Sequence, residues 1–210
     1  MLFRSLALRE RPTFLGALLG GFALLVCGAV ALSSTLTAPL ITQRQQEDTQ
    51  RLLAQVLPNQ AYDQLPSKEE LTLTLDGKPV HLFRARRDGK VSAIALFAES
   101  RGYSGQIKLL LGIDASGVLT GVRVVSHTET PGLGDKIDLS KTNWILGFNG
   151  KSLENPGESH WKVKKDGGDF DSFTGATITP RAVVKGVHES LILFAKHKGE
   201  LLDLSAGTKE

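Results

Sequence analysis

Small and hydroxyl-bearing residues immediately precede a strong helix pattern near the end of the sequence, in the segment DSFTGAT over residues 171–177. The N-terminus of a helix presents unpaired backbone N–H groups and a partial positive charge, which together favour a phosphate. Thr177 supplies a hydroxyl there, and Gly175 and Ala176 are small enough for a bulky anion to approach the backbone. Taken alone, the pattern also describes an ordinary capped helix start that binds nothing.

A second segment of interest is GIDASGVLTGVRVVSHTETPGLGDKI, over residues 112–137. It combines a valine-rich, strand-like run with a loop that contains two glycines and a proline. By itself this loop could be a tight turn between a sheet and a helix. A histidine at a strand end, His127, and a solvated acid, Glu129, are each common in proteins, so neither identifies a site on its own.

The two segments together resemble one family. The run Asp171-x-x-Thr174-Gly175-Ala176-Thr177 matches the D-x-x-[ST]-G-A-T signature of proteins that carry FMN covalently, through a phosphoester on the final threonine. Residues 112–137 are similar to the FMN-binding domain of the G subunit of the Rnf (Rsx) electron transport complex. The motifs occur in the family's order behind a single N-terminal anchor, so the resemblance covers nearly the whole chain.

The resemblance implies that Thr177 is the attachment point of FMN and that a separate flavin transferase forms the bond from FAD. Beside a flavin, loop glycines would let backbone N–H groups reach the polar edge of the ring, and Leu133 could cover an apolar ring face. The cofactor-binding candidates besides Thr177 are Thr174, Gly175, Ala176, Glu129, Thr130, Pro131, Gly132, Leu133 and Gly134. No residue is predicted to be catalytic, and no His/Cys cluster suggests a metal site.

A long apolar segment near the N-terminus predicts a membrane anchor. Residues 14–32 carry no charge, and with the uncharged stretch that follows they exceed the roughly 20 apolar residues that span a bilayer. A cleaved signal peptide is the alternative, but its apolar core would be about 7 to 15 residues long. Arg4, Arg9 and Arg11 precede the span and are expected to stay in the cytoplasm. We therefore expect a single-pass protein of a bacterial inner membrane, with its C-terminal domain in the periplasm.

The composition narrows the function further. The chain has 210 residues, a formal net charge of +3 and one cysteine, Cys27, which lies inside the predicted span. The exported region therefore has no disulfide and must rely on its own hydrophobic core. Because there is no concentrated Lys/Arg tract with interleaved aromatic residues, the sequence does not favour nucleic-acid binding.

The patterns predict an α+β fold in which a central antiparallel sheet is flanked by helices, with the helices against one face. Strand-like runs at 71–75, 80–86 and 91–100 alternate with short turns, and two further strands follow within 102–127. The expected organisation is a cytoplasmic N-terminus over 1–13, a transmembrane anchor over 14–38, a helical stalk over 39–70 and an exported FMN-binding domain over 71–210.

Two helices are expected outside the membrane. Pro39 should end or bend the membrane helix, and a second amphipathic helix follows it until Pro58. The last helix should have Thr179 as its N-cap and Pro180 at its first position. The earlier helix is expected to be a stalk or a lid on the domain, and the later one carries an apolar stripe. The apolar residues that recur at helical spacing are Leu52, Leu53, Val56 and Leu57 in the earlier helix and Val184, Val187, Leu191 and Ala195 in the later one.

The function that the resemblance implies is that of an electron carrier, one subunit of a membrane complex that couples electron transfer between ferredoxin and NAD to ion translocation. The isolated chain would catalyse no complete reaction, and its partners would be the other membrane subunits and the flavin transferase. Two alternatives remain open. One is the related C subunit of the sodium-translocating NADH:quinone reductase, and the other is a membrane-anchored sensory or assembly module that keeps the fold without redox turnover.

Overall fold

The computed structural model describes residues 12–58, 62–63 and 70–203, and the chain divides into two units after Glu47. The first unit holds most of helix α2, which extends over Pro12–Val56. Residues Thr13–Ala38 of this helix are long and apolar enough to cross a membrane, by length and composition. Pro39 was expected to end or bend the helix, and the first of these outcomes is wrong because α2 continues through Pro39 to Val56. A proline inside a helix removes one backbone donor, a loss that membrane-spanning helices tolerate.

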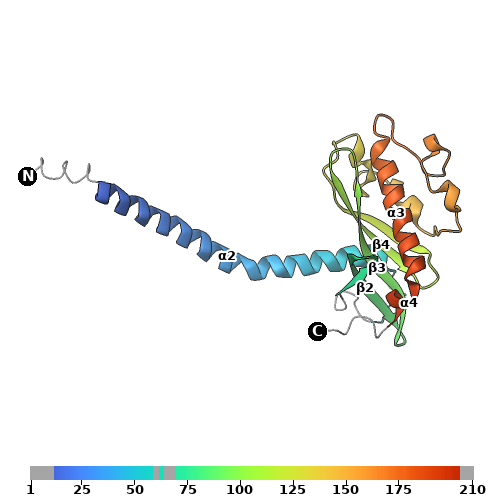
Figure 1. Cartoon of the computed structure of the whole chain (residues 1–210), viewed down its shortest axis with the longest axis horizontal. Coiled ribbons are helices and arrows are strands. Elements are labelled where there is room, and N and C mark those ends of the chain that lie inside the picture. The colour runs from blue at the N-terminus through green and yellow to red at the C-terminus, as the bar shows by residue number, and fades with distance from the viewer. Residues whose placement is uncertain (1–11, 59–61, 64–69, 204–210) are drawn as a thin grey trace, which may run out of the picture. The chain divides into compact units, whose positions relative to one another are not determined.

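The second unit is built on a five-stranded antiparallel sheet in which neighbouring strands follow each other in the chain, as Figure 1 shows. The tight turns explain this order. Asp76-Gly77 and Asp88-Gly89 both have positive φ at both residues, which is the geometry of two-residue hairpin turns that match the twist of a sheet. The strands are β1 (Glu70–Leu75), β2 (Lys78–Arg87), β3 (Lys90–Arg101), β4 (Gln106–Asp114) and β5 (Leu119–Ser126).

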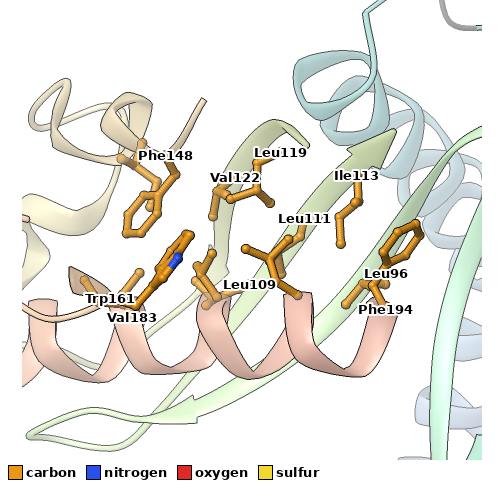
Figure 2. Close-up of a cluster of buried hydrophobic side chains, with 14 of the residues drawn as sticks. Leu96, Leu109, Leu111, Ile113, Leu119, Val122, Phe148, Trp161, Val183 and Phe194 are labelled. Carbon is orange, nitrogen blue, oxygen red and sulfur yellow. The ribbon is translucent and has the colours of Figure 1, made fainter. Parts of the chain in front are cut away.

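One face of the sheet is covered by helix α3 (Ile178–Lys196) and by short 3-10 helices of the segment between β5 and α3. Figure 2 shows Leu109, Leu111 and Ile113 of β4 in the layer between the sheet and α3. The 3-10 helices are η3 (Gly134–Ile137), η4 (Trp144–Phe148), η5 (Glu158–His160) and η6 (Lys164–Asp166). The main core of the second unit therefore lies on this face.

The end of α2 covers the opposite face, so the expectation that helices lie against one face only is wrong. Leu53, Val56 and Leu57 are buried there against a second cluster of sheet residues. A Cβ added to Gly112 would lie 2.2 Å from the carbonyl oxygen of Val56, so β4 and the helix approach each other closely because this residue has no side chain. The sheet residues of this cluster are Phe83, Ala85, Ala93, Ala95 and Leu110.

Helix α3 presents most of its predicted apolar stripe to the sheet. Val184, Val187 and Leu191 are buried as expected, whereas Ala195 is exposed and Phe194 is buried in its place. Positions three and four residues beyond Leu191 both lie near the same helix face, and the larger apolar side chain gains more by burial. The stripe was therefore predicted correctly except for its last residue.

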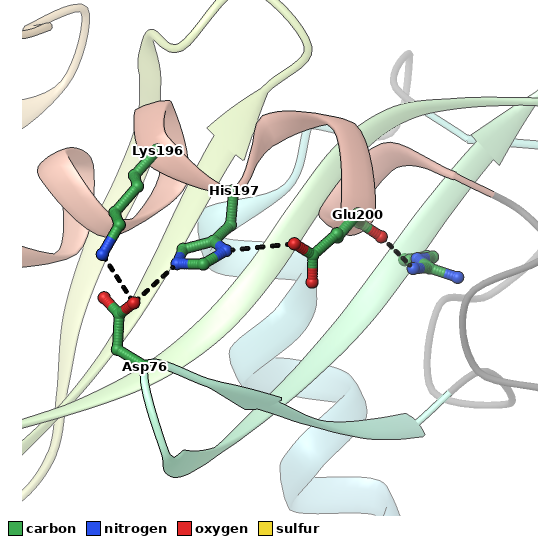
Figure 3. A network of polar contacts seen from close by, with 5 residues as sticks. Asp76, Lys196, His197 and Glu200 are labelled. Atoms are coloured by element: carbon green, nitrogen blue, oxygen red, sulfur yellow. Dashed lines mark hydrogen bonds and ion pairs between the residues drawn. The ribbon is translucent and has the colours of Figure 1, made fainter.

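The C-terminal end of α3 is tied to the first hairpin. Lys196 donates to Asp76 in the turn between β1 and β2 at 2.6 Å, and His197 lies between Asp76 and Glu200, as Figure 3 shows. Arg84 of β2 is 1% exposed and donates to main-chain carbonyls of the short helix α4 (Lys198–Leu202) at 2.9 Å. These contacts hold the β1–β2 hairpin to the end of the C-terminal helices.

Candidate functional site

The start of α3 leaves the hydroxyl of Thr177 unused by the helix. Thr177 is the N-cap residue, and its carbonyl oxygen accepts a hydrogen bond from the Arg181 N–H at 3.3 Å. Its own side chain makes no capping hydrogen bond, and the residue is half-buried. The predictions of Thr179 as N-cap and Pro180 as first helical residue are therefore wrong by two positions.

The turn before Thr177 is open to solvent and depends on a glycine. Gly175 has φ of +81°, a conformation that favours glycine, and both Thr174 and Gly175 are exposed. The Ala176 N–H donates to the Phe173 carbonyl at 3.1 Å and closes the turn. The chain thus reaches Thr177 through an exposed turn that carries little side-chain bulk.

Asp171, at the start of the same motif, is held by two contacts. The indole N–H of Trp144 donates to its main-chain carbonyl at 2.9 Å, and the Lys164 ammonium lies 2.7 Å from its carboxylate. Trp144 in turn packs edge-on against Phe173. These contacts position the beginning of the motif, while its end stays accessible.

The loop over residues 130–134 is compact and largely exposed. The N–H groups of Leu133 and Gly134 both donate to the Thr130 carbonyl, at 3.1 and 3.2 Å, and Gly132 has φ of +77°. Thr130, Pro131 and Gly132 are exposed, and the Leu133 side chain is 43% exposed. An apolar side chain is therefore presented to solvent from a backbone that glycine allows to turn.

The tertiary structure brings this loop and the 174–177 turn together. A Cβ added to Gly175 would lie 3.6 Å from Cδ2 of Leu133, which is ordinary van der Waals distance. Ile178, the first residue of α3, is 47% exposed immediately after Thr177. A free hydroxyl at a helix start is thus accompanied by two exposed apolar side chains, an arrangement that fits a ligand with a phosphate and an apolar ring.

Glu129 faces inward from the loop. It is 5% exposed, it accepts a hydrogen bond from the Thr179 hydroxyl, and the Ser104 N–H donates to its other oxygen at 3.0 Å. Gly134 packs against this pair, because a Cβ there would lie 2.7 Å from Oε2 of Glu129. Glu129 therefore joins the loop to the first turn of α3, a role that its position in the sequence did not reveal. The Glu129 N–H also donates to Nδ1 of His127 at 3.1 Å.

Two further carboxyl groups, those of Asp135 and Asp166, lie near the loop and the helix start. Among the described residues, Oδ1 of Asp135 is buried without a hydrogen-bond partner, next to Gly134 in the chain. The pKa of Asp166 is lowered, first by the hydrogen bond from Arg181 in the first turns of α3 and further by Arg181 and by Lys165 through their charge. Neither group could be assigned to the site from the sequence pattern.

Comparison with known proteins adds independent information. A family model described as FMN-binding domain matches residues 102–192, and a model described as RnfG N-terminal region matches residues 15–56. The G subunit of the ion-translocating oxidoreductase complex of Cereibacter sphaeroides is 47% identical over 195 residues, covering 92% of this chain and 89% of that protein. The G subunits of Vibrio cholerae and Pseudomonas aeruginosa are 46% and 48% identical, over 89% and 88% of this chain and 91% and 89% of theirs.

The fold also has a relative among solved structures. The C subunit of the Na⁺-translocating NADH-quinone reductase from Parabacteroides distasonis superposes with a TM-score of 0.55 and 21% identity. The match covers 75% of this chain and 94% of that chain. At this level of identity the likeness concerns the fold alone.

Proposed function

The chain belongs to the family of the G subunits of ion-translocating oxidoreductase (Rnf) complexes, and we propose that its FMN is carried covalently, as a phosphoester on Thr177. It is an FMN electron-carrier subunit of such a complex, and one N-terminal apolar helix anchors it in the membrane. The remaining subunits of the complex are its partners. The attachment site, the ring contacts and the orientation in the membrane are the proposed parts.

The observation that carries the proposal is the position of the Thr177 hydroxyl. It lies at the start of a 19-residue helix without a capping bond of its own, in a turn whose Gly175 lies beside Leu133 of the 130–134 loop. The unpaired N–H groups of the helix start would stabilise the negative charge of a phosphodiester. The match of residues 171–177 to the attachment signature supports the same position.

Each residue of the site has a proposed task. Thr177 would hold the phosphate, Thr174, Gly175 and Ala176 would leave room beside it, and residues 130–134 would contact the ring. FMN, when bound, supplies reversible one- and two-electron transfer. Leu133 and Ile178 would exclude water from part of an apolar ring face, because both present exposed apolar side chains beside the attachment point. Glu129 would hold the loop against α3 through its hydrogen bond with Thr179.

Attachment requires a group-transfer step by a separate flavin transferase. In that step Oγ1 of Thr177 would form a bond to the flavin-side phosphorus of FAD, the bond from this phosphorus to the bridging oxygen would break, and AMP would leave. The hydroxyl proton would go to a base of the transferase or to solvent. A covalent link would prevent loss of the flavin by dissociation from a domain outside the cytoplasm.

The orientation and domain organisation are proposed from charge and pattern. Arg4, Arg9 and Arg11 would remain in the cytoplasm, which would place the FMN-binding domain on the periplasmic side of an inner membrane. The proposed segments are a cytoplasmic 1–13, an anchor over 14–38, a helical stalk over 39–70 and the domain over 71–210. The helical part of this stalk ends at Val56, and Glu70 already belongs to β1. The end of the helix would also serve as a layer of the domain, because Leu53, Val56 and Leu57 pack on the sheet.

The two alternatives are less well supported. The solved C subunit shares the fold at 21% identity, whereas the relatives at 46–48% identity over most of the chain are all named as G subunits. A match over residues 15–56 to the RnfG N-terminal region also favours the G family. A sensory module without redox turnover would not need a covalent flavin, so the attachment experiment separates it from the proposal.

The test is the mass of the full chain, purified under denaturing conditions from its native host, beside a Thr177→Ala variant and a Thr74→Ala control at an exposed position of β1. We expect an FMN-sized adduct on the wild type and on the control, localised to the peptide that contains Thr177, and no adduct on Thr177→Ala. An unmodified wild-type mass from cells with an active transferase would refute covalent attachment. An adduct that persists in Thr177→Ala would refute the attachment site.

A further inference from the structure

The sheet splits between β2 and β3, and a groove opens where it does. The two strands pair from Arg87↔Lys90 to Leu82↔Leu96, although β2 begins at Lys78 and β3 continues to Arg101. The groove measures about 1290 Å³ and is lined by the unpaired ends of both strands and by α3. We propose that an extended segment of another subunit of the complex binds in this groove as an additional strand between β2 and β3.

The unpaired part of β3 presents backbone groups to the groove. The Gly102 N–H donates to the Gly105 carbonyl at 2.8 Å, so these residues form a hydrogen-bonded pair at the β3–β4 turn. Because such pairs alternate along an antiparallel ladder, the N–H and C=O groups of Phe97, Glu99 and Arg101 point away from β4. The groups of Phe97 flank the last β2–β3 pair, Leu82↔Leu96, and belong to that ladder. Those of Glu99 and Arg101 point toward the groove, where the described residues supply no strand to pair with them.

The opposite wall explains why the sheet splits at this point. Lys78 pairs with Leu75 across the two-residue turn, so the backbone groups of Pro79 and His81 face β3. Those of His81 flank the last β2–β3 pair, which leaves Pro79 as the residue whose backbone faces the groove. Pro79 has no N–H and cannot donate to β3, which is why proline is confined to strand edges. The β1–β2 hairpin is instead held at its tip by the ion pair of Asp76 with Lys196.

The groove also specifies the side chains of its occupant. Val80, Leu96 and Ala98 face α3, and Gly186 and Leu193 line the groove from the helix, so small apolar side chains are favoured on this side. Successive side chains of a strand point to opposite faces of the sheet, so the side chains of the inserted strand that point away from α3 can be polar.

The mouth of the groove adds a charge preference. Lys78 and Arg101 line it at the open end and have no ion pair with a described residue. The acidic residues that line the groove are already paired: Asp76 with Lys196, Glu99 with Lys108 and Glu189 with Lys185. An acidic residue at the corresponding end of the occupant would therefore bind favourably.

The geometry selects a single extended segment. A strand that inserts between two unpaired edges must itself have both edges free, whereas the edge of a folded sheet has only one. The strands of a second copy of this chain are paired within their own sheet. A linker or tail of another membrane subunit meets the requirement, and the family places this chain in a multi-subunit complex.

The test uses Glu99→Pro with Glu99→Ala as its matched control, in the full chain purified with its complex from native membranes in detergent. Both variants remove the side chain of Glu99 and its ion pair, but only proline removes an N–H that faces the groove. Without this N–H, a carbonyl group of the inserted strand would be buried with no hydrogen-bond donor. We therefore expect Glu99→Pro to lower retention of the partner subunit by about tenfold. Glu99→Ala should stay within about twofold of the wild type.

A photo-crosslinking residue at His81 would identify the occupant, with the same residue at Tyr103, an exposed position, as its control. The expected result is a crosslink from His81 to one peptide of another subunit. The amide hydrogens of Glu99 and Arg101 should also exchange about tenfold more slowly in the complex than in the isolated full chain. A crosslink to a second copy or to this chain's own C-terminal peptide, equal retention of both Glu99 variants, or unchanged exchange would overturn the proposal. The FMN adduct, measured on the same samples, reports separately on the proposed flavin site.

Discussion

Replacing Thr179 by valine would test whether the buried contact with Glu129 holds the candidate site together. Thr179 is 1% exposed, and its hydroxyl is a donor to Glu129, which is itself 5% exposed. Valine has nearly the same shape, so the substitution removes the hydroxyl without opening a large cavity. One oxygen of a buried carboxyl group then loses its donor.

The expected cost follows from that loss. Leaving a buried polar group without its hydrogen bond costs about 1–3 kcal/mol, and the amide of Ser104 still satisfies the other oxygen of Glu129. We therefore expect the free energy of unfolding to fall by about 2 kcal/mol. With a urea slope of about 2 kcal/mol per molar, the unfolding midpoint should fall by about 1 M.

The assay is urea unfolding of the full chain in detergent, followed by tryptophan fluorescence. The chain's two tryptophans, Trp144 and Trp161, both lie in the second unit, so the signal reports on this unit alone. Thr74→Val, on an exposed position of β1, is the control and should change the free energy by less than about 0.5 kcal/mol. If Thr179→Val costs no more than this control, the inference that Glu129 locks the loop to α3 is refuted.

Three further substitutions have defined outcomes. Arg84→Met removes two hydrogen bonds from a buried guanidinium to main-chain carbonyls of α4. It should lower the free energy of unfolding by about 3 kcal/mol in the same urea assay, and a loss below about 1 kcal/mol would contradict the proposed role of Arg84. The pKa of Asp76 lies below its ordinary value of 3.8, chiefly because of the hydrogen bond from Lys196, so its stabilisation is present above that value and is lost as the pH falls below it. Asp76→Asn should therefore destabilise the protein at pH 7 and have little effect near pH 2, as measured by Tm at both pH values; equal effects would count against this contact. Gly112→Ala would place a Cβ against the last carbonyl of α2 and should lower the free energy of unfolding by more than about 2 kcal/mol. The control, Gly147→Ala, has open space around it and should lower this free energy by less than about 1 kcal/mol. Similar urea midpoints for the two variants would show that the close approach of β4 and α2 is not needed.

Local patterns determined much of this structure. The Asp-Gly pairs at 76–77 and 88–89 favour two-residue hairpin turns, and alternation in the flanking segments placed the strands correctly because both signals act over a few residues. The uncharged segment near the N-terminus predicted the membrane helix for the same reason. The sequence motifs also identified the family before any contact was known, and the comparisons confirmed it.

The tertiary structure decided the features that depend on distant contacts. Thr179 has the side chain of an N-cap, but its hydroxyl bonds to Glu129, fifty residues earlier in the chain, and α3 begins before it. No local pattern could show that Leu133 would lie beside Gly175, because the two residues are brought together only when the loop after β5 folds back onto the start of α3. The packing of α2 on the second face of the sheet and the split between β2 and β3 also depend on contacts between segments that are distant in the chain. Local patterns therefore could not predict them.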